Sequence, residues 1–176
     1  VALLASHPCR IAVDTSDAPL AALIASLDRG APDLIKPNAE ELAGVLGYSP
    51  QALEAAVDQG DPGPVVSAAR QLIDMGIGAV LATLGAAGAV LVDGNGAWMA
   101  TPPPIVPRST VGAGDSSLAG YVRADVGGAD PPQRLQMAVA YGSAAAALPG
   151  TTLPTPAEID LNAVQVSPIS PIPATQ

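Results

Sequence analysis

The order in which apolar segments follow one another constrains the fold of this chain more than any other feature of its sequence. Short runs of Val, Ile, Leu and Ala, within residues 10–14, 33–35 and 79–83, alternate with longer segments whose apolar residues recur every three or four positions. The short runs are typical of buried strands and the longer spacing of amphipathic helices. Strands that alternate with helices usually pair in parallel, so the sequence predicts an α/β layered fold with a mainly parallel sheet.

Helices are predicted at residues 17–27, 38–46, 65–75, 113–126 and 131–148. Asp17 and Asn38 are residue types that cap the start of a helix, and Gly47 is typical of a helix end. Residues 89–100 predict a hairpin, because the turn sequence Asp-Gly-Asn-Gly lies between two apolar runs. Residues 49–63 are polar and contain Pro and Gly, which indicates a surface connection.

The two ends of the chain differ from the rest. Residues 1–5 have the composition of the last part of a helix, but no capping residue precedes them, a pattern typical of a segment taken from a longer domain. Residues 162–176 are rich in Pro and Ser and lack periodicity, which predicts a disordered tail. The sequence therefore predicts one domain at residues 1–161 and a tail at residues 162–176.

Charge and composition exclude several classes of partner and site. The formal net charge is −9, so we expect no basic surface for the phosphates of nucleic acids or of an anionic membrane. No apolar run reaches the length of about 18 residues that is expected of a transmembrane helix. Cys9 is the only cysteine, which rules out an internal disulfide and fits a reducing cytoplasm. His7 lies close to it, but two such residues do not make a zinc site.

The strongest chemical signal is the run Gly112, Ala113, Gly114 and Asp115 at the predicted start of a helix. Small residues let backbone N–H groups approach a ligand, and the N-terminus of a helix attracts negative charge. The run therefore predicts an anion site with a carboxylate at its edge, and such a pairing is typical of functional sites. The alternative is a simple glycine turn with Asp115 as an acid in the first helical turn.

Three common kinds of site do not match this run. A phosphate-binding loop would need a Gly-Lys-Ser/Thr sequence, and Lys36 is the only lysine. A dinucleotide-binding loop would need a glycine in place of Ser117 and a buried strand before the run. A catalytic Ser-His-Asp triad is not expected, because His7 is the only histidine and the sequence has no Gly-x-Ser-x-Gly motif. Phosphoryl transfer remains, with the loop holding charge and Asp115 accepting a proton.

Ligands of α/β sheets bind beyond the carboxyl ends of the strands. Asp14, residues 36–38 and residues 83–85 all follow predicted strands. We therefore expect them on one rim of the sheet, together with the loop at residues 112–115.

Three motifs in this order resemble a known family. Residues 109–116, Ser-Thr-Val-Gly-Ala-Gly-Asp-Ser, look like the signature of the PfkB, or ribokinase-like, carbohydrate kinases. Residues 33–42 resemble the Asn-x-x-Glu region of that family, and residues 83–89 resemble its nucleotide turn. The pair Leu-Ile-Lys-Pro-Asn and Ser-Thr-Val-Gly-Ala-Gly-Asp is most similar to the 1-phosphofructokinase branch. The resemblance covers about residues 10–160 and implies a ribokinase-like three-layer α/β/α fold that is incomplete on its N-terminal side.

The resemblance also implies roles for individual residues. Asp115 would be the catalytic base, and the glycine loop, which is Gly112, Ala113 and Gly114, would form the anion hole. Asn38 and Glu41 would organise magnesium through water, although without the family they are equally well a helix cap and a first-turn acid. The nucleotide would be bound by Lys36, Asn38, Gly114 and the nucleotide turn, which comprises Thr83, Leu84, Gly85, Ala86, Ala87 and Gly88. Residues 140–144 would either cover adenine or pack against another helix.

The implied activity is the ATP- and Mg²⁺-dependent phosphorylation of a sugar phosphate, from fructose 1-phosphate to fructose 1,6-bisphosphate. The alternatives are another PfkB substrate (tagatose 6-phosphate, fructose 6-phosphate, ribose or a nucleoside) and a non-catalytic fragment that only binds a nucleotide. The resemblance places the enzyme in the cytoplasm and allows a homodimer of a full-length protein. Ser109 and Val111 occupy positions where many family members bind a monovalent cation, so potassium activation is not expected.

Overall fold

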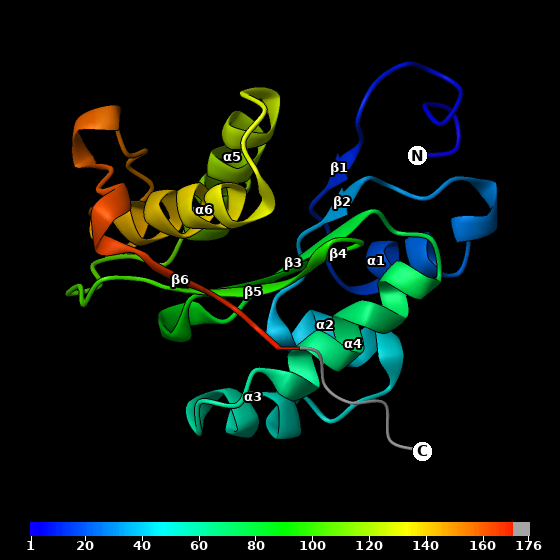
Figure 1. Ribbon diagram of the computed structural model, residues 1–176, viewed down its shortest axis with the longest axis horizontal. Helices are drawn as coiled ribbons and strands as arrows, with labels where there is room; N and C mark the ends of the chain where they lie inside the picture. The colour runs from blue at the N-terminus through cyan, green and yellow to red at the C-terminus, as the bar shows by residue number, and fades with distance from the viewer. Residues whose placement is uncertain (171–176) are drawn as a thin grey trace. The chain divides into compact units, whose positions relative to one another are not determined.

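The computed structural model describes residues 1–170, and their strands form one mixed sheet (Figure 1). The strands β1 (Ala12–Val13), β2 (Leu34–Ile35), β3 (Ala79–Thr83), β4 (Ala89–Asp93), β5 (Gly96–Thr101) and β6 (Gln165–Pro168) follow one another in this order across it. The strands β1, β2 and β3 are parallel, whereas β6 is antiparallel to β5. The α/β architecture predicted from the alternation of segments is confirmed.

The chain divides into two compact units. Among the described residues, the first comprises residues 1–85, 90–97 and 169–170, and the second comprises residues 86–89 and 98–168. This division was not predicted, because no segment of linker-like composition separates the two units. Within residues 1–170, no helix combines the length and the apolar character that a bilayer span requires.

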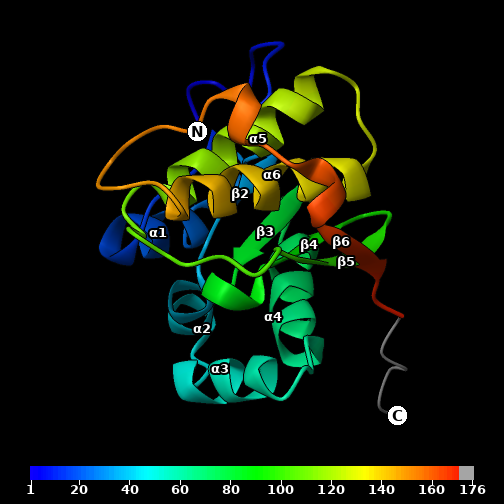
Figure 2. The ribbon, with the colours of Figure 1, turned by 90° about the vertical axis from the view of Figure 1, so that its left-hand side faces the viewer.

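The first unit contains four helices, α1 (Asp17–Ile24), α2 (Ala39–Leu46), α3 (Pro50–Asp58) and α4 (Gly63–Asp74). The helices α2, α3 and α4 pack on one another, and α4 also packs against β3 (Figure 2). Several side chains at the predicted apolar positions are fully buried, among them Leu42 of α2, Leu72 of α4 and Leu81 of β3, whereas Met75 is exposed. Apolar burial on this scale is the main favourable contribution to the stability of the unit.

The second unit is built around α5 (Ala113–Val126) and α6 (Pro131–Ala146), whose bounds agree closely with the predicted helices. The two helices approach very closely at Gly120, where an added Cβ would lie 2.6 Å from the carbonyl oxygen of Met137. Asp130 caps α6 and accepts a hydrogen bond from the amide of Gln133 at 2.9 Å. Arg134 of α6 forms an ion pair with Asp125 of α5 at 3.0 Å.

The N-terminal residues differ from their prediction. Residues 1–5 form a hydrogen-bonded turn rather than the end of a helix, with the amides of Leu4 and Ala5 both donating to the carbonyl of Val1. The strand β1 has two residues, and Ala12 is exposed, because this strand is at the edge of the sheet. Asp17 is the first residue of α1 rather than its cap, and it has a φ of +51°.

Two elements were missed. The predicted connection at residues 49–63 contains α3, whose short apolar face buries only Leu53, and the Pro and Gly residues around it had indicated a connection. The predicted disordered tail contains β6 at its start, because its backbone pairs with residues 98–101 of β5. Pro168 is compatible with this position because β6 is an edge strand. Residues 171–176 of the predicted tail lie outside the described residues.

Candidate active site

Strand ends bring charged residues together in the first unit. Asp14 follows β1, Lys36 follows β2, and the Nζ atom of Lys36 lies 3.0 Å from Oδ2 of Asp14. The Lys36 side chain is 8% exposed and that of Asp14 is 28% exposed, so the ion pair is largely shielded from water. A buried ammonium group is stable only when it is paired, which explains why a carboxylate lies at this place.

The backbone around Lys36 is fixed on both sides. Its amide donates to the carbonyl of Val13 at 3.1 Å, and the amide of Thr83 donates to the carbonyl of Pro37 at 3.0 Å. Asn38 forms a parallel bridge with Thr83. Within the first unit the predicted rim is therefore confirmed, since the ends of β1, β2 and β3 meet through these bonds.

Asn38 and Glu41 complete the start of α2. Oδ1 of Asn38 accepts a hydrogen bond from the amide of Glu41, and Oε2 of Glu41 accepts one from the amide of Asn38, both at 2.8 Å. This reciprocal capping box confirms Asn38 as the helix cap. Each of the two oxygens keeps a further lone pair, so contact with magnesium through water is chemically compatible with the capping box.

No direct metal site is formed by side chains in the described part of the chain. Among residues 1–170, no three or more His, Cys, Asp or Glu side chains lie close enough together to hold a metal ion. Magnesium often keeps several waters and takes its remaining ligands from a substrate phosphate. The predicted role of Asn38 and Glu41 in organising magnesium stays a prediction.

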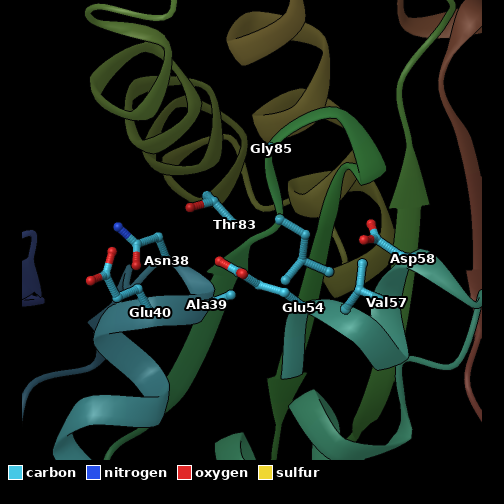
Figure 3. A pocket seen from close by; sticks show the side chains of 9 residues that line it. Asn38, Ala39, Glu40, Glu54, Val57, Asp58, Thr83 and Gly85 are labelled. Atoms are coloured by element: carbon cyan, nitrogen blue, oxygen red, sulfur yellow. The ribbon is translucent and has the colours of Figure 1, made fainter. Parts of the chain in front are cut away.

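A pocket of about 300 Å³ opens beside the start of α2. Figure 3 shows side chains of α2 and α3 around it, with Thr83 and Gly85 at the end of β3. It is lined by Asn38, Ala39, Glu40, Glu54, Val57, Asp58, Thr83, Leu84 and Gly85. Three of the predicted nucleotide-turn residues and Asn38 thus share one cavity.

The side of this pocket that α3 forms was not predicted from the sequence. Glu54, Val57 and Asp58 come from residues that had been predicted to be a surface connection. The available signal was the pair Ser49 and Pro50, because a serine at the cap followed by a proline at the first helical position is typical of a helix start.

The nucleotide turn has a conformation that depends on glycine. Gly85 has a φ of +57° and Gly88 a φ of +103°, values that side chains rarely adopt. An added Cβ at Gly88 would also overlap the carbonyl oxygen of Ala100. The structure therefore gives both glycines a turn role, and the predicted role in nucleotide binding remains a prediction.

The glycine loop lies in the second unit, at the start of α5. Gly112 is the N-cap residue with a φ of +81°, and no side chain caps the helix. Asp115 lies in the first turn and is exposed, whereas the following Ser116 and Ser117 are buried. The predicted helix start with an accessible acid is confirmed. The predicted binding of an anion there stays a prediction.

The structure favours one of the two interpretations of residues 140–144. An added Cβ at Gly142 would lie 3.3 Å from the carbonyl oxygen of Ala113 and 3.3 Å from Cβ of Ser117, so Gly142 packs directly against the first turns of α5. Ala140 is 2% exposed. These contacts support helix packing for Ala140 and Gly142, and the cover for adenine stays a prediction.

Comparison with known sequences decides the family. Residues 5–158 match the family described as pfkB family carbohydrate kinase. The chain belongs to this family. The family membership predicted from the three motifs is thus confirmed.

Individual relatives come from the phosphofructokinases. The chain is 38% identical over 155 residues to the 1-phosphofructokinase of Rhodobacter capsulatus, covering 88% of this chain and 45% of that protein. It is 33% identical over 133 residues to the ATP-dependent 6-phosphofructokinase isozyme 2 of Escherichia coli, covering 75% of this chain and 40% of that protein. The chain therefore spans less than half the length of these two relatives.

Solved structures agree on the fold. The phosphofructokinase-2 of Escherichia coli, solved in complex with substrates and products, matches with a TM-score of 0.72 and 32% identity over 85% of this chain and 45% of that one. The ribokinase of Thermotoga maritima matches with a TM-score of 0.58 and 22% identity over 72% of this chain and 40% of that one, which is evidence for the fold alone. The predicted ribokinase-like fold is confirmed.

Proposed function

We propose that this chain carries the nucleotide-binding and phosphoryl-transfer part of an ATP-dependent kinase that converts fructose 1-phosphate to fructose 1,6-bisphosphate. The similarity to the 1-phosphofructokinase of Rhodobacter capsulatus over 88% of the chain supports this choice of substrate. The observation that carries the chemistry is the start of α5, where an uncapped helix N-terminus and the exposed Asp115 share one turn.

In this proposal Asp115 is the general base. Its carboxylate accepts the proton of the sugar 6-hydroxyl as the hydroxyl oxygen bonds to the γ-phosphorus of ATP and the bond to the ADP oxygen breaks. The glycine loop holds the charge on the transferring phosphoryl group. The amide of Ala113 already donates to the carbonyl of Thr110 at 3.2 Å, so the amides of Gly112 and Gly114 are the better candidates for this contact.

The strand-end residues of the first unit serve the nucleotide in the same proposal. The ammonium group of Lys36 attracts the polyphosphate, and the nucleotide turn, residues 83–88, lines the nucleotide. Magnesium, when bound, would neutralise charge on the polyphosphate, and Asn38 and Glu41 would hold it through water.

A second substrate has support of its own. The chain is 33% identical to the 6-phosphofructokinase isozyme 2 of Escherichia coli and matches the phosphofructokinase-2 structure with a TM-score of 0.72. Fructose 6-phosphate is therefore the alternative acceptor, in which case the attacking hydroxyl is the one at C1.

The test is a phosphorylation assay on the longest protein that the gene encodes, with ATP, magnesium and one acceptor at a time. We expect the highest kcat/KM with fructose 1-phosphate, and lower values with fructose 6-phosphate and tagatose 6-phosphate. A higher value with fructose 6-phosphate would establish the alternative. Binding of ATP without transfer to any of these sugars would instead support the non-catalytic fragment.

A further inference from the structure

The ion pair between Lys36 and Asp14 has a consequence for how the proposed site binds phosphate. Lys36 is the only lysine of the sequence, and its side chain is 8% exposed. A lysine with a long flexible side chain would be free to leave the site if nothing held its ammonium group. The carboxylate that holds it, 3.0 Å away, belongs to Asp14.

The restraint on Lys36 comes from two neighbouring strands. Its amide is bonded to Val13 of β1, and the carbonyl of the next residue, Pro37, accepts from Thr83 of β3. With the backbone fixed in this way, Asp14 determines where the end of the side chain lies. An ammonium group has three N–H donors, so it can bind a phosphate oxygen and keep its bond to Asp14.

We propose that Asp14 is a positioning residue that holds the Lys36 side chain in place for the polyphosphate of the nucleotide. The proposal rests on the proposed function, and it adds a residue that acts through Lys36 rather than on the ligand itself. Asp14 also carries a cost for binding, since its charge partly neutralises that of Lys36. Loss of the positioning would weaken phosphate binding, whereas loss of the negative charge would strengthen it. The affinity of an Asp14 variant for phosphate therefore shows which effect is larger.

The experiment measures the binding of two probes by calorimetry, inorganic tripolyphosphate and ATP with magnesium, to the longest protein that the gene encodes. We expect Asp14→Asn to weaken tripolyphosphate binding by about tenfold or more, because a charged hydrogen bond no longer holds Lys36. Asp14→Glu should recover part of the affinity. In a Lys36→Met background, Asp14→Asn should have no further effect on binding, since it acts through the lysine.

The chain provides a matched control in its other ion pair. Arg134→Met breaks a pair of the same 3.0 Å length, with Asp125, in the second unit. It should lower the melting temperature and leave tripolyphosphate binding unchanged. An equal loss of binding in Arg134→Met would overturn the positioning role, because the loss would then follow from general destabilisation.

Two further outcomes separate the positioning role from the proposed function. If Asp14→Asn binds tripolyphosphate as tightly as the wild type or more tightly, Asp14 only neutralises Lys36 and the positioning role is wrong. If the wild type binds neither probe, the proposed function fails and the positioning role fails with it. Should Asp14→Asn unfold, the comparison of Asp14→Glu with the wild type still tests the role, since a longer carboxylate side chain must shift Lys36 and weaken binding.

Discussion

The helices α2 and α5 both begin at a residue that the sequence singled out for function, but their first turns are completed in different ways. At α2, the side chains of Asn38 and Glu41 satisfy the backbone amides of each other. At α5, Gly112 adopts a φ of +81° and no side chain caps the helix. A bound anion adds little stability to a helix start whose amides are already bonded to side chains. It adds more to a helix start that no side chain caps.

The difference separates the roles of two acids in the same helical position. Glu41 and Asp115 are both in the third position of their helices, where a carboxylate is favourable for the helix dipole. Glu41 is bonded to the backbone and Asp115 is exposed. The comparison therefore assigns a structural contribution to Glu41 and leaves Asp115 as an accessible carboxylate, as the proposed role of a base requires.

The largest expected effect comes from Asp115→Asn, which removes the proposed base and leaves the shape of the side chain unchanged. We expect kcat for sugar phosphorylation to fall by about 10²–10⁴-fold, the usual contribution of a general base. Binding of ATP should persist. Asp74→Asn, at an exposed carboxylate near the end of α4, is the control and should keep its turnover. Unchanged turnover in Asp115→Asn would show that Asp115 is not the base. The difference between the starts of α2 and α5 would then have no catalytic meaning.

The next effect concerns the left-handed residue before α5. Gly112→Ala should lower the free energy of unfolding by about 1–2 kcal/mol, because a Cβ is unfavourable at this φ. Gly44→Ala should have the opposite effect. Gly44 is inside α2 with nothing within 4 Å of an added Cβ, so this substitution should raise the free energy of unfolding by about 0.5–1 kcal/mol. Denaturant unfolding measures both. A neutral Gly112→Ala would show that the helix start relaxes easily.

Breaking the capping box of α2 should have a smaller effect. Asn38→Ala removes one of the two reciprocal bonds and should cost about 1 kcal/mol of the free energy of unfolding. A double-mutant cycle with Glu41→Ala should show coupling, because the two side chains bond to the same turn. Additive effects of the two substitutions would contradict the capping box as a cooperative unit.

The smallest effect is expected at a third helix start. Asp17 is the first residue of α1 and has a φ of +51°, which glycine adopts without strain. We expect Asp17→Gly to raise the free energy of unfolding by less than about 1 kcal/mol, since aspartate tolerates this conformation better than most residues. A clear loss of stability would mean that the Asp17 side chain makes a contribution that outweighs its backbone strain.

The parts of the fold that could be predicted are those set by local sequence. The start and end of α2 follow from Asn38 and Gly47, which lie within one helical turn of the backbone groups they serve. The bounds of α5 follow from Gly112 and the apolar spacing after it. Such signals need no knowledge of the rest of the molecule, and all of them agree with the structure.

The parts that could not be predicted depend on distant partners. The helix α3 buries a single leucine, so beyond the start signal at Ser49 and Pro50 its position depends on packing against α2 and α4. The ion pair of Lys36 with Asp14 joins residues 22 positions apart along the chain. The sequence shows that both follow strands, but it does not show that their side chains are in contact. The same limit applies to the capping box, because Asn-x-x-Glu is the pattern of a helix cap and of a metal-organising motif alike.

The pairing of β6 with β5 has a consequence for how the protein must be produced. Gln165 lies opposite Thr101 and Pro168 lies opposite Trp98, so β6 covers one edge of β5. A protein truncated at residue 161, where the sequence placed the end of the domain, would leave that edge open. Unpaired strand edges recruit other chains, so such a truncated protein should aggregate where the longer one stays in solution.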